Sequence, residues 1–210
     1  MKRDATSQRA LHRRTFLQAG AAGFAALATG AHASEAEVAK STLVHVKHAE
    51  ATDAEGFGNP KIVREMVHRA VCELAGKKDL AEAWASYVGP DDVVGLKVNV
   101  RAGKRLCTQP CTVDAIIEGL RAAGVTDEHI LVWDAWNREF PLAGYTLNES
   151  DKGVRCYGSD HGVLHNRRRA DGDEAREALR PYFADEPVVI GGKLVWVTKI
   201  LTEEITALIN

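Results

Sequence analysis

Apolar positions along the chain recur with a period of either two or about 3.6 residues, and these periods predict strands and helices in turn. Helices are predicted at 60–76, 80–88 and 110–125, and the first and last of them have apolar stripes that end at glycines. Strands are predicted at 41–49, 93–100, 128–137 (ending near Asp134), 155–157, 191–201 and 204–210. The strand, helix and strand between 93 and 137 predict a βαβ unit with parallel pairing. We therefore predict an α/β, Rossmann-like three-layer fold with a mostly parallel sheet.

The first 33 residues have the layout of a bacterial export signal. A basic leading region is followed by residues 19–31, which are uncharged, and then by a small-x-small sequence that ends at Ala33. This order predicts cleavage near Ala33 and a single α/β domain over 34–210. The apolar run is too short and too weakly apolar for a stable membrane span. The alternative is an amphipathic N-terminal helix or a disordered tail.

Within this leader, a pair of arginines precedes a Phe-Leu step, as in twin-arginine signals. The residues concerned are Arg13, Arg14, Phe16 and Leu17. They predict the twin-arginine export machinery as a partner and a periplasmic location. Because that machinery carries folded proteins, its use is typical of chains that receive a cofactor before export.

Composition narrows the function classes further. The hydrophobic content is 45%, and the net charge is −2 with a pI near 6.5. A nucleic-acid-binding protein usually has a basic excess, so we predict no nucleic-acid partner. The four cysteines allow three full disulfide pairings, and the sequence does not choose among them.

Polar side chains occur where two predicted strands end. Lys97 and Asn99 alternate along the first strand of the βαβ unit, and Asp134 ends the second. Ligands of open parallel sheets bind beyond these carboxyl ends, so we predict Lys97, Asn99 and Asp134 as catalytic residues. The alternative is a buried ion pair between Lys97 and Asp134 that only stabilises the sheet.

The loop between those elements is basic and leads into a helix. Cations and free N–H groups at a helix start favour an anion such as phosphate or carboxylate. The predicted ligand-binding residues are Arg101, Lys104, Arg105, Thr108 and Arg138. Neither nucleotide-binding glycine fingerprint is present. The alternative is a solvated loop with Thr108 as a plain helix N-cap.

Cysteine and histidine spacings give weaker signals for metal. Cys107 and Cys111 are spaced C-x-x-x-C, which fits a disulfide or two buried thiols better than a zinc or ferredoxin site. His161 and His165, with Asp160 and Cys156 nearby, have metal-binding atoms, although histidines in loops are common on protein surfaces.

Several motifs together resemble the exported, twin-arginine branch of the domain-of-unknown-function 362 family. They lie at 94–99 (VGLKVN), 102–110 (AGKRLCTQP), 112–124 and 132–134 (VWD). Members of that family are often described as iron–sulfur proteins, so the resemblance implies such a cluster and matches Lys97, Asn99, Thr108 and Asp134 to family positions.

The chain also departs from the family pattern. Cys107 replaces a serine, no ferredoxin-type cysteine motif is present, and the family continues beyond the segment matching 200–210. The resemblance therefore implies a truncated chain with a fold incomplete at the C-terminus. These features together predict an exported periplasmic protein with a redox- or metal-associated role. The alternatives are a binding module for an anionic small molecule without catalysis, or a truncated remnant.

Overall fold

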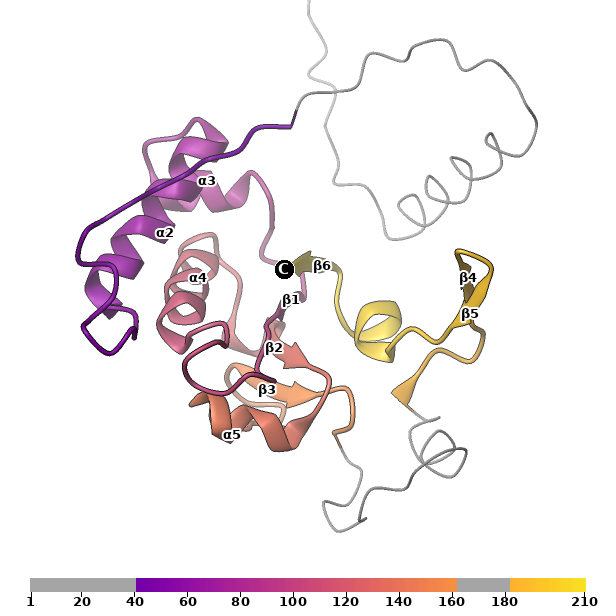
Figure 1. The fold of residues 1–210 in the computed structure, drawn as a ribbon. Helices are drawn as coiled ribbons and strands as arrows, with labels where there is room; N and C mark the ends of the chain where they lie inside the picture. Colours follow the sequence, from indigo (N-terminus) through magenta and orange to yellow (C-terminus); the bar gives the residue numbers. More distant parts are fainter. Residues whose placement is uncertain (1–40, 162–181) are drawn as a thin grey trace, which may run out of the picture. The chain divides into compact units, whose positions relative to one another are not determined.

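A four-stranded sheet forms the centre of the fold (Figure 1). The computed structural model describes residues 41–161 and 182–210. The strands are β1 (Val94–Lys97), β2 (Ile130–Asp134), β3 (Arg155–Gly158) and β6 (Ala207–Ile209), in the order β3-β2-β1-β6. Every neighbouring pair is parallel. The predicted α/β, Rossmann-like fold with a parallel sheet is therefore confirmed.

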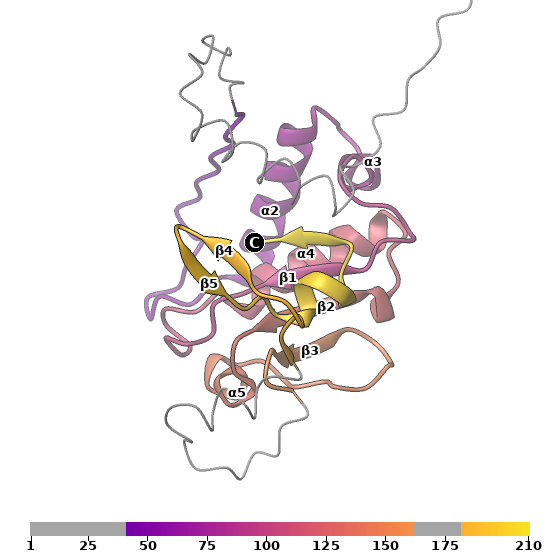
Figure 2. The ribbon, with the colours of Figure 1, turned by 90° about the vertical axis from the view of Figure 1, so that its right-hand side faces the viewer.

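The strand order reverses at β1, as Figure 2 shows. From β1 the chain proceeds to β2 and β3, and it then returns to add β6 on the other side of β1. In sheets of this type, ligands bind beyond the carboxyl ends of the strands, close to the reversal. The topology thus indicates a ligand site at the end of the sheet where Lys97 and Asp134 lie.

Three helices lie on one side of the sheet: α4 (Pro110–Ala122), and α2 (Pro60–Ala75) and α3 (Leu80–Ala85), which pack on α4. They confirm the predicted helices. In α4 the buried residues Val113, Ile117 and Leu120 recur every three or four positions and pack on buried side chains of β1 and β2. Trp84 of α3 joins the same core.

The other face of the sheet is covered by a segment that follows the hairpin described below. A short π-helix, η4 (Ile200–Glu204), brings Ile200 and Ile205 onto Leu131, Trp133 and Tyr157. Gly95 makes this approach possible, because a Cβ there would lie 2.5 Å from Ile205 Cδ1. This segment is the third layer of the fold.

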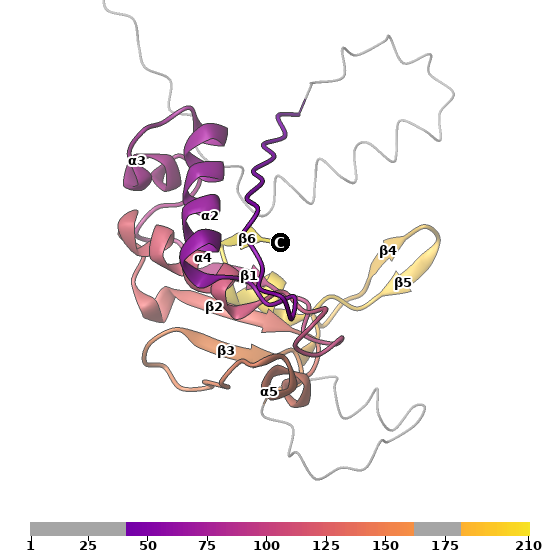
Figure 3. The same cartoon turned by 60° about the vertical axis from the view of Figure 1, so that its left-hand side comes forward.

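A separate hairpin, β4 (Val188–Ile190) and β5 (Lys193–Val195), stands apart from the main sheet (Figure 3). Gly191 and Gly192 join its strands with φ values of 57° and 76°, the positive φ values that a type I′ turn requires. The predicted strand at 191–201 was therefore wrong in extent, because it begins in this turn and ends in η4.

Other differences from the prediction concern strand ends. Residues 41–48 form no strand, and Leu43 is 90% exposed, so this segment lacks the burial that stabilises strands. β1 ends at Lys97 rather than at residue 100, and β6 covers only 207–209 of the predicted 204–210. The remaining short elements are η1 (Asp127–His129), η2 (Asn137–Glu139) and α5 (Phe140–Ala143).

Residues 44–210 belong to one compact unit of the chain. The predicted export signal at 1–33, with Arg13, Arg14, Phe16 and Leu17, lies outside the described residues. None of the helices within 41–161 and 182–210 has the length and apolar character needed to span a membrane.

Candidate ligand site at the carboxyl edge of the sheet

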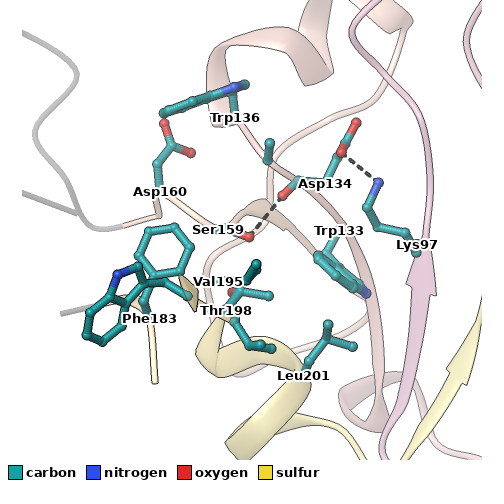
Figure 4. Close-up of a pocket in the computed structure, with 13 residues that line it drawn as sticks. Lys97, Trp133, Asp134, Trp136, Ser159, Asp160, Phe183, Val195, Thr198 and Leu201 are labelled. Atoms are coloured by element: carbon teal, nitrogen blue, oxygen red, sulfur yellow. Dashed lines mark hydrogen bonds and ion pairs between the residues drawn. The ribbon is translucent and has the colours of Figure 1, made fainter. Parts of the chain in front are cut away.

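A cavity of about 350 Å³ opens at the carboxyl ends of β1, β2 and β3 (Figure 4). We call it the edge cavity. Lys97 reaches it from the end of β1, residues 133–136 from the end of β2 and the loop after it, and Ser159 and Asp160 from the loop after β3. Phe183, residues 195–198 and Leu201 complete the wall. Segments far apart in the sequence therefore meet at the end of the sheet that the topology indicates.

Lys97 and Asp134 form an ion pair in the wall of this cavity. Lys97 Nζ donates to Asp134 Oδ1 at 2.7 Å and to the carbonyl oxygen of Val98 at 2.6 Å. The second carboxylate oxygen of Asp134 accepts from the backbone N–H of Val100 at 2.8 Å. The Lys97 side chain remains 30% exposed and that of Asp134 11%. The pair is thus a satisfied structural contact that also borders the cavity. The catalytic role of Lys97 and Asp134 stays a prediction.

Asp160 is held by a different network, centred on the fully buried Asn137. The backbone N–H of Asn137 donates to Asp160 Oδ1 at 2.7 Å. The Asn137 side chain accepts from the N–H of Gly158 and donates to Glu149. A Cβ at Gly158 would lie 2.6 Å from the Asn137 nitrogen, so glycine permits this close approach. The network fixes the ends of β2 and β3 and orients the Asp160 carboxylate.

Aromatic side chains form much of the remaining wall. Trp133, Trp136, Phe183 and Trp196 all line the edge cavity. In Figure 4, Trp136 lies beside Asp160, whereas Trp133 and Phe183 lie on opposite sides of the view. Our sequence analysis missed these aromatic residues. Trp133 and Trp136 lie close to Asp134 at the end of a predicted strand, so the sequence could have indicated them as site residues. No local sequence pattern indicated Phe183 or Trp196.

Asn99 and Thr108, both predicted site residues, hold the loop after β1 together instead of lining the cavity. The backbone N–H of Asn99 donates to Thr108 Oγ1 at 3.1 Å, and its carbonyl accepts from the Thr108 N–H at 2.9 Å. Since β1 ends at Lys97, Asn99 does not continue the strand face, and its side chain accepts from the Arg101 N–H at 3.2 Å.

The alternative prediction for Thr108, that it is a helix N-cap, was wrong, because Gln109 occupies the N-cap position of α4. The Gln109 side chain makes no capping bond but donates to the carbonyl oxygen of Gly56 at 3.1 Å and accepts from the N–H of Gly58. The predicted anion-binding cations, Arg101, Lys104 and Arg105, are exposed and do not line the edge cavity. Their role as an anion site stays a prediction.

Arg138 is exposed at the rim of the site. Its guanidinium lies 5.6 Å from the centroid of the Trp136 ring, within the range of a cation–π contact. Lys97 Nζ lies 5.5 Å from the ring centroid of Trp133. Two cavity-lining indoles therefore already interact with cations of the chain itself.

The cysteines do not fit the iron–sulfur cluster that the family resemblance implies. All four are free thiols, and they lie in α2, in the loop before α4, in α4 and in β3. Such clusters are normally held by cysteine thiolates brought together around the metal. In the described parts of the chain no three Cys, His, Asp or Glu side chains are grouped to hold a metal ion. Burial raises the pKa of the Cys156 thiol to about 12 and also raises that of Cys107.

Of the two histidines that the sequence suggested as metal ligands, only His161 lies within the described residues. His165 lies outside them. The His161 ring packs against Tyr157 and Tyr182, with ring centroids 4.2 and 5.4 Å away, and its Nδ1 lies 3.2 Å from the Gly158 carbonyl oxygen. These contacts give His161 a packing role beside the edge cavity.

A second, smaller cavity of about 200 Å³ adjoins these residues. It shares Ser159 and Thr198 with the edge cavity, and its charged groups pair with one another or with neighbouring side chains. Lys199 lies 4.0 Å from Glu203, and Tyr157 donates to Glu204 at 2.5 Å. Burial, followed by this contact with Glu204, raises the pKa of the Tyr157 hydroxyl. The second cavity is therefore lined by internally satisfied polar groups.

No family model, curated protein or solved structure matches the chain. The resemblance to the domain-of-unknown-function 362 family stays a prediction.

Proposed function

We propose that this chain is a binding protein for a small organic molecule, which it holds in the edge cavity after export to the periplasm. The apolar body of the ligand contacts the aromatic wall, and its polar group reaches the charged residues Lys97, Asp134 and Asp160. The observation that supports the proposal is the convergence of these charged and aromatic groups at the carboxyl ends of three parallel strands.

The character of the cavity supports a ligand site rather than a packing defect. Small-molecule sites are typically concave, of about 300–1,000 Å³, and mostly apolar with a few placed polar groups. The edge cavity has about 350 Å³ and combines an aromatic wall with one lysine and two aspartates. The structural contacts of Lys97, Asp134 and Asp160 hold these groups in place before a ligand arrives.

Binding is proposed rather than covalent catalysis because the described cavity residues include no activated nucleophile. The hydroxyl of Ser159 donates to the backbone oxygen of Asp134 at 3.4 Å and has no side-chain base as its partner. The export part of the proposal is supported by the order of basic, apolar and small residues at 1–33. The redox part of the sequence-based prediction gains no support from the described cysteines.

Tryptophan fluorescence tests the binding proposal directly. Three of the four tryptophans line the edge cavity, and the fourth, Trp84, belongs to the core under the helices. We expect a panel of small organic molecules to include ligands that change the emission saturably, and Trp136→Leu to weaken their binding. The control is Tyr87→Leu, which removes an exposed aromatic ring that does not line the cavity.

Two results would contradict the proposal. One is a panel without any saturable emission change. The other is a ligand whose affinity is the same in the wild-type protein, the Trp136→Leu variant and the Tyr87→Leu variant.

A further inference from the structure

We infer that the ligand of the edge cavity is an organic cation, such as a quaternary ammonium or a protonated amine. This inference rests on the proposed function and adds the chemical class of the ligand. It follows from the balance of charges in the cavity wall and from the type of surface that surrounds them.

The lining of the cavity has an excess of negative charge. It contains one lysine, Lys97, against two aspartates, Asp134 and Asp160. Lys97 is neutralised by Asp134 at 2.7 Å. Asp160 uses one oxygen to accept from the Asn137 N–H, and no Lys, Arg or His in the described residues forms an ion pair with it. Among the described residues that line the cavity, Asp160 is thus the carboxylate without an ion-pair partner, and Arg138 at the rim contacts the Trp136 ring.

The surface around this charge is suited to a cation. The faces of aromatic rings present negative electrostatic potential, and tryptophan binds cations most strongly among the aromatic residues. The contacts of Lys97 with Trp133 and of Arg138 with Trp136 are already of this kind, and Phe183 and Trp196 add further rings to the wall. Figure 4 shows Trp136 next to Asp160. A cation placed there meets an aromatic face and a carboxylate together. Aromatic walls of this kind are the usual means of binding quaternary ammonium groups.

An anion would meet the opposite situation. Lys97 Nζ already donates to Asp134 and to the carbonyl oxygen of Val98. An anion that approached Lys97 would also approach the carboxylate of Asp134, which lies 2.7 Å from Lys97 Nζ, and like charges so close together repel. The exposed cations Arg101 and Lys104 do not line this cavity, and Arg138 reaches only its rim, over the Trp136 ring.

Three probes of nearly the same shape separate these possibilities. Choline is the cation, 3,3-dimethylbutan-1-ol replaces its nitrogen by carbon and is neutral, and 3,3-dimethylbutanoate is the anion. Binding to the full chain is measured by tryptophan fluorescence and calorimetry. We expect choline to bind at least about tenfold more tightly than the alcohol, as a cation–π contact with indole implies, and the carboxylate to bind most weakly.

A variant tests the counter-charge. Asp160→Asn keeps an oxygen that can accept from Asn137 but removes the negative charge. We expect it to weaken choline binding by roughly fivefold to tenfold and to leave binding of the alcohol unchanged. The matched control is Asp151→Asn, at an exposed carboxylate outside the cavity. Circular dichroism checks that each variant is folded, and the probe selectivity of the wild-type chain does not depend on any variant.

The outcomes are distinguishable. If the alcohol or the carboxylate binds as tightly as choline, the assignment to a cation is overturned while the binding function stands. If choline selectivity persists unchanged in Asp160→Asn, the role given to Asp160 is overturned. If none of the three probes binds, the cation assignment is overturned, whereas the binding function is contradicted only if the wider panel of small organic molecules also gives no saturable emission change.

Discussion

Asp134 shows how one side chain can join a loop to a strand end. Its carboxylate accepts from Lys97 with one oxygen and from the backbone of Val100 with the other. It therefore connects β2 to the chain leaving β1, just beyond the last ladder bonds of β1. Because the Asp134 side chain is only 11% exposed, removing its partners or the carboxylate itself leaves polar groups with little access to water.

We expect Asp134→Ala to lower the free energy of unfolding by about 2–4 kcal/mol, because both bonds are lost and Lys97 is left without its counter-ion. Asp134→Asn should cost less, roughly 1–2 kcal/mol, because an amide oxygen still accepts from Val100 and the part-exposed Lys97 is solvated. Urea denaturation measures both, with the exposed Asp151→Ala as the control. If both Asp134 variants lower the free energy of unfolding by the same amount, the hydrogen bond from the Val100 N–H to Asp134 contributes nothing to stability.

For single residues, the sequence predicted the Lys97–Asp134 pair but only part of the lining of the edge cavity. Lys97 and Asp134 were identifiable because a lysine in an apolar strand and an aspartate at a strand end need partners. Asn99 was assigned to the same group because the strand was expected to continue to residue 100, but β1 ends at Lys97. Phe183 and Trp196 could not be predicted, because they reach the cavity through tertiary contacts with no local pattern.

The packing of α4 on α3 depends on a single glycine. A Cβ on Gly119 would lie 1.9 Å from Trp84 Nε1 and 2.4 Å from Trp84 Cε2, so the indole occupies the space of the missing side chain. The helical period predicted α4 and its buried stripe, but it did not predict that Gly119 is one of the contact positions. Glycine in a helix interior usually destabilises the helix, and here the contact with Trp84 explains its presence.

Gly119→Ala should therefore destabilise the protein despite the better helix propensity of alanine. Propensity favours alanine by about 1 kcal/mol, whereas overpacking of a filled core costs typically about 1–3 kcal/mol. We expect a net loss of stability in urea, accompanied by a change in Trp84 emission. Asp114→Ala, at an exposed position of the same helix, is the control and should stay within about 0.5 kcal/mol of the wild type. A gain of stability in Gly119→Ala would contradict this account of the contact.

The β4–β5 hairpin was predictable in principle and was missed. Two apolar runs separated by Gly191-Gly192 are a strong hairpin signal, but residues 191–201 were assigned to one strand. The segment after the hairpin matters for the site, because residues 195–198 form part of the cavity wall. The apolar runs around a glycine turn indicate the hairpin, whereas the part that Val195 takes in the cavity wall is a tertiary contact with no local pattern.

At the scale of the whole described unit, the topology accounts for the position of the site. Parallel pairing of β1, β2 and β3 places their carboxyl ends side by side, and Phe183 and Trp196, from the segment before β6, meet that end. The fold class followed from the alternation of strands and helices. The cavity could not be predicted, because Phe183 and residues 195–198 are far in the sequence from the strand ends that they meet and no local pattern indicates the contact.

Whether the edge cavity is a ligand site can be tested by following the four indole N–H resonances of the 15N-labelled protein during titrations with the panel of small organic molecules, choline included. The account predicts that the resonances of Trp133, Trp136 and Trp196 move saturably, whereas that of Trp84 in the helical core stays in place. Resonances that stay in place throughout, or a Trp84 shift as large as the other three, would contradict it.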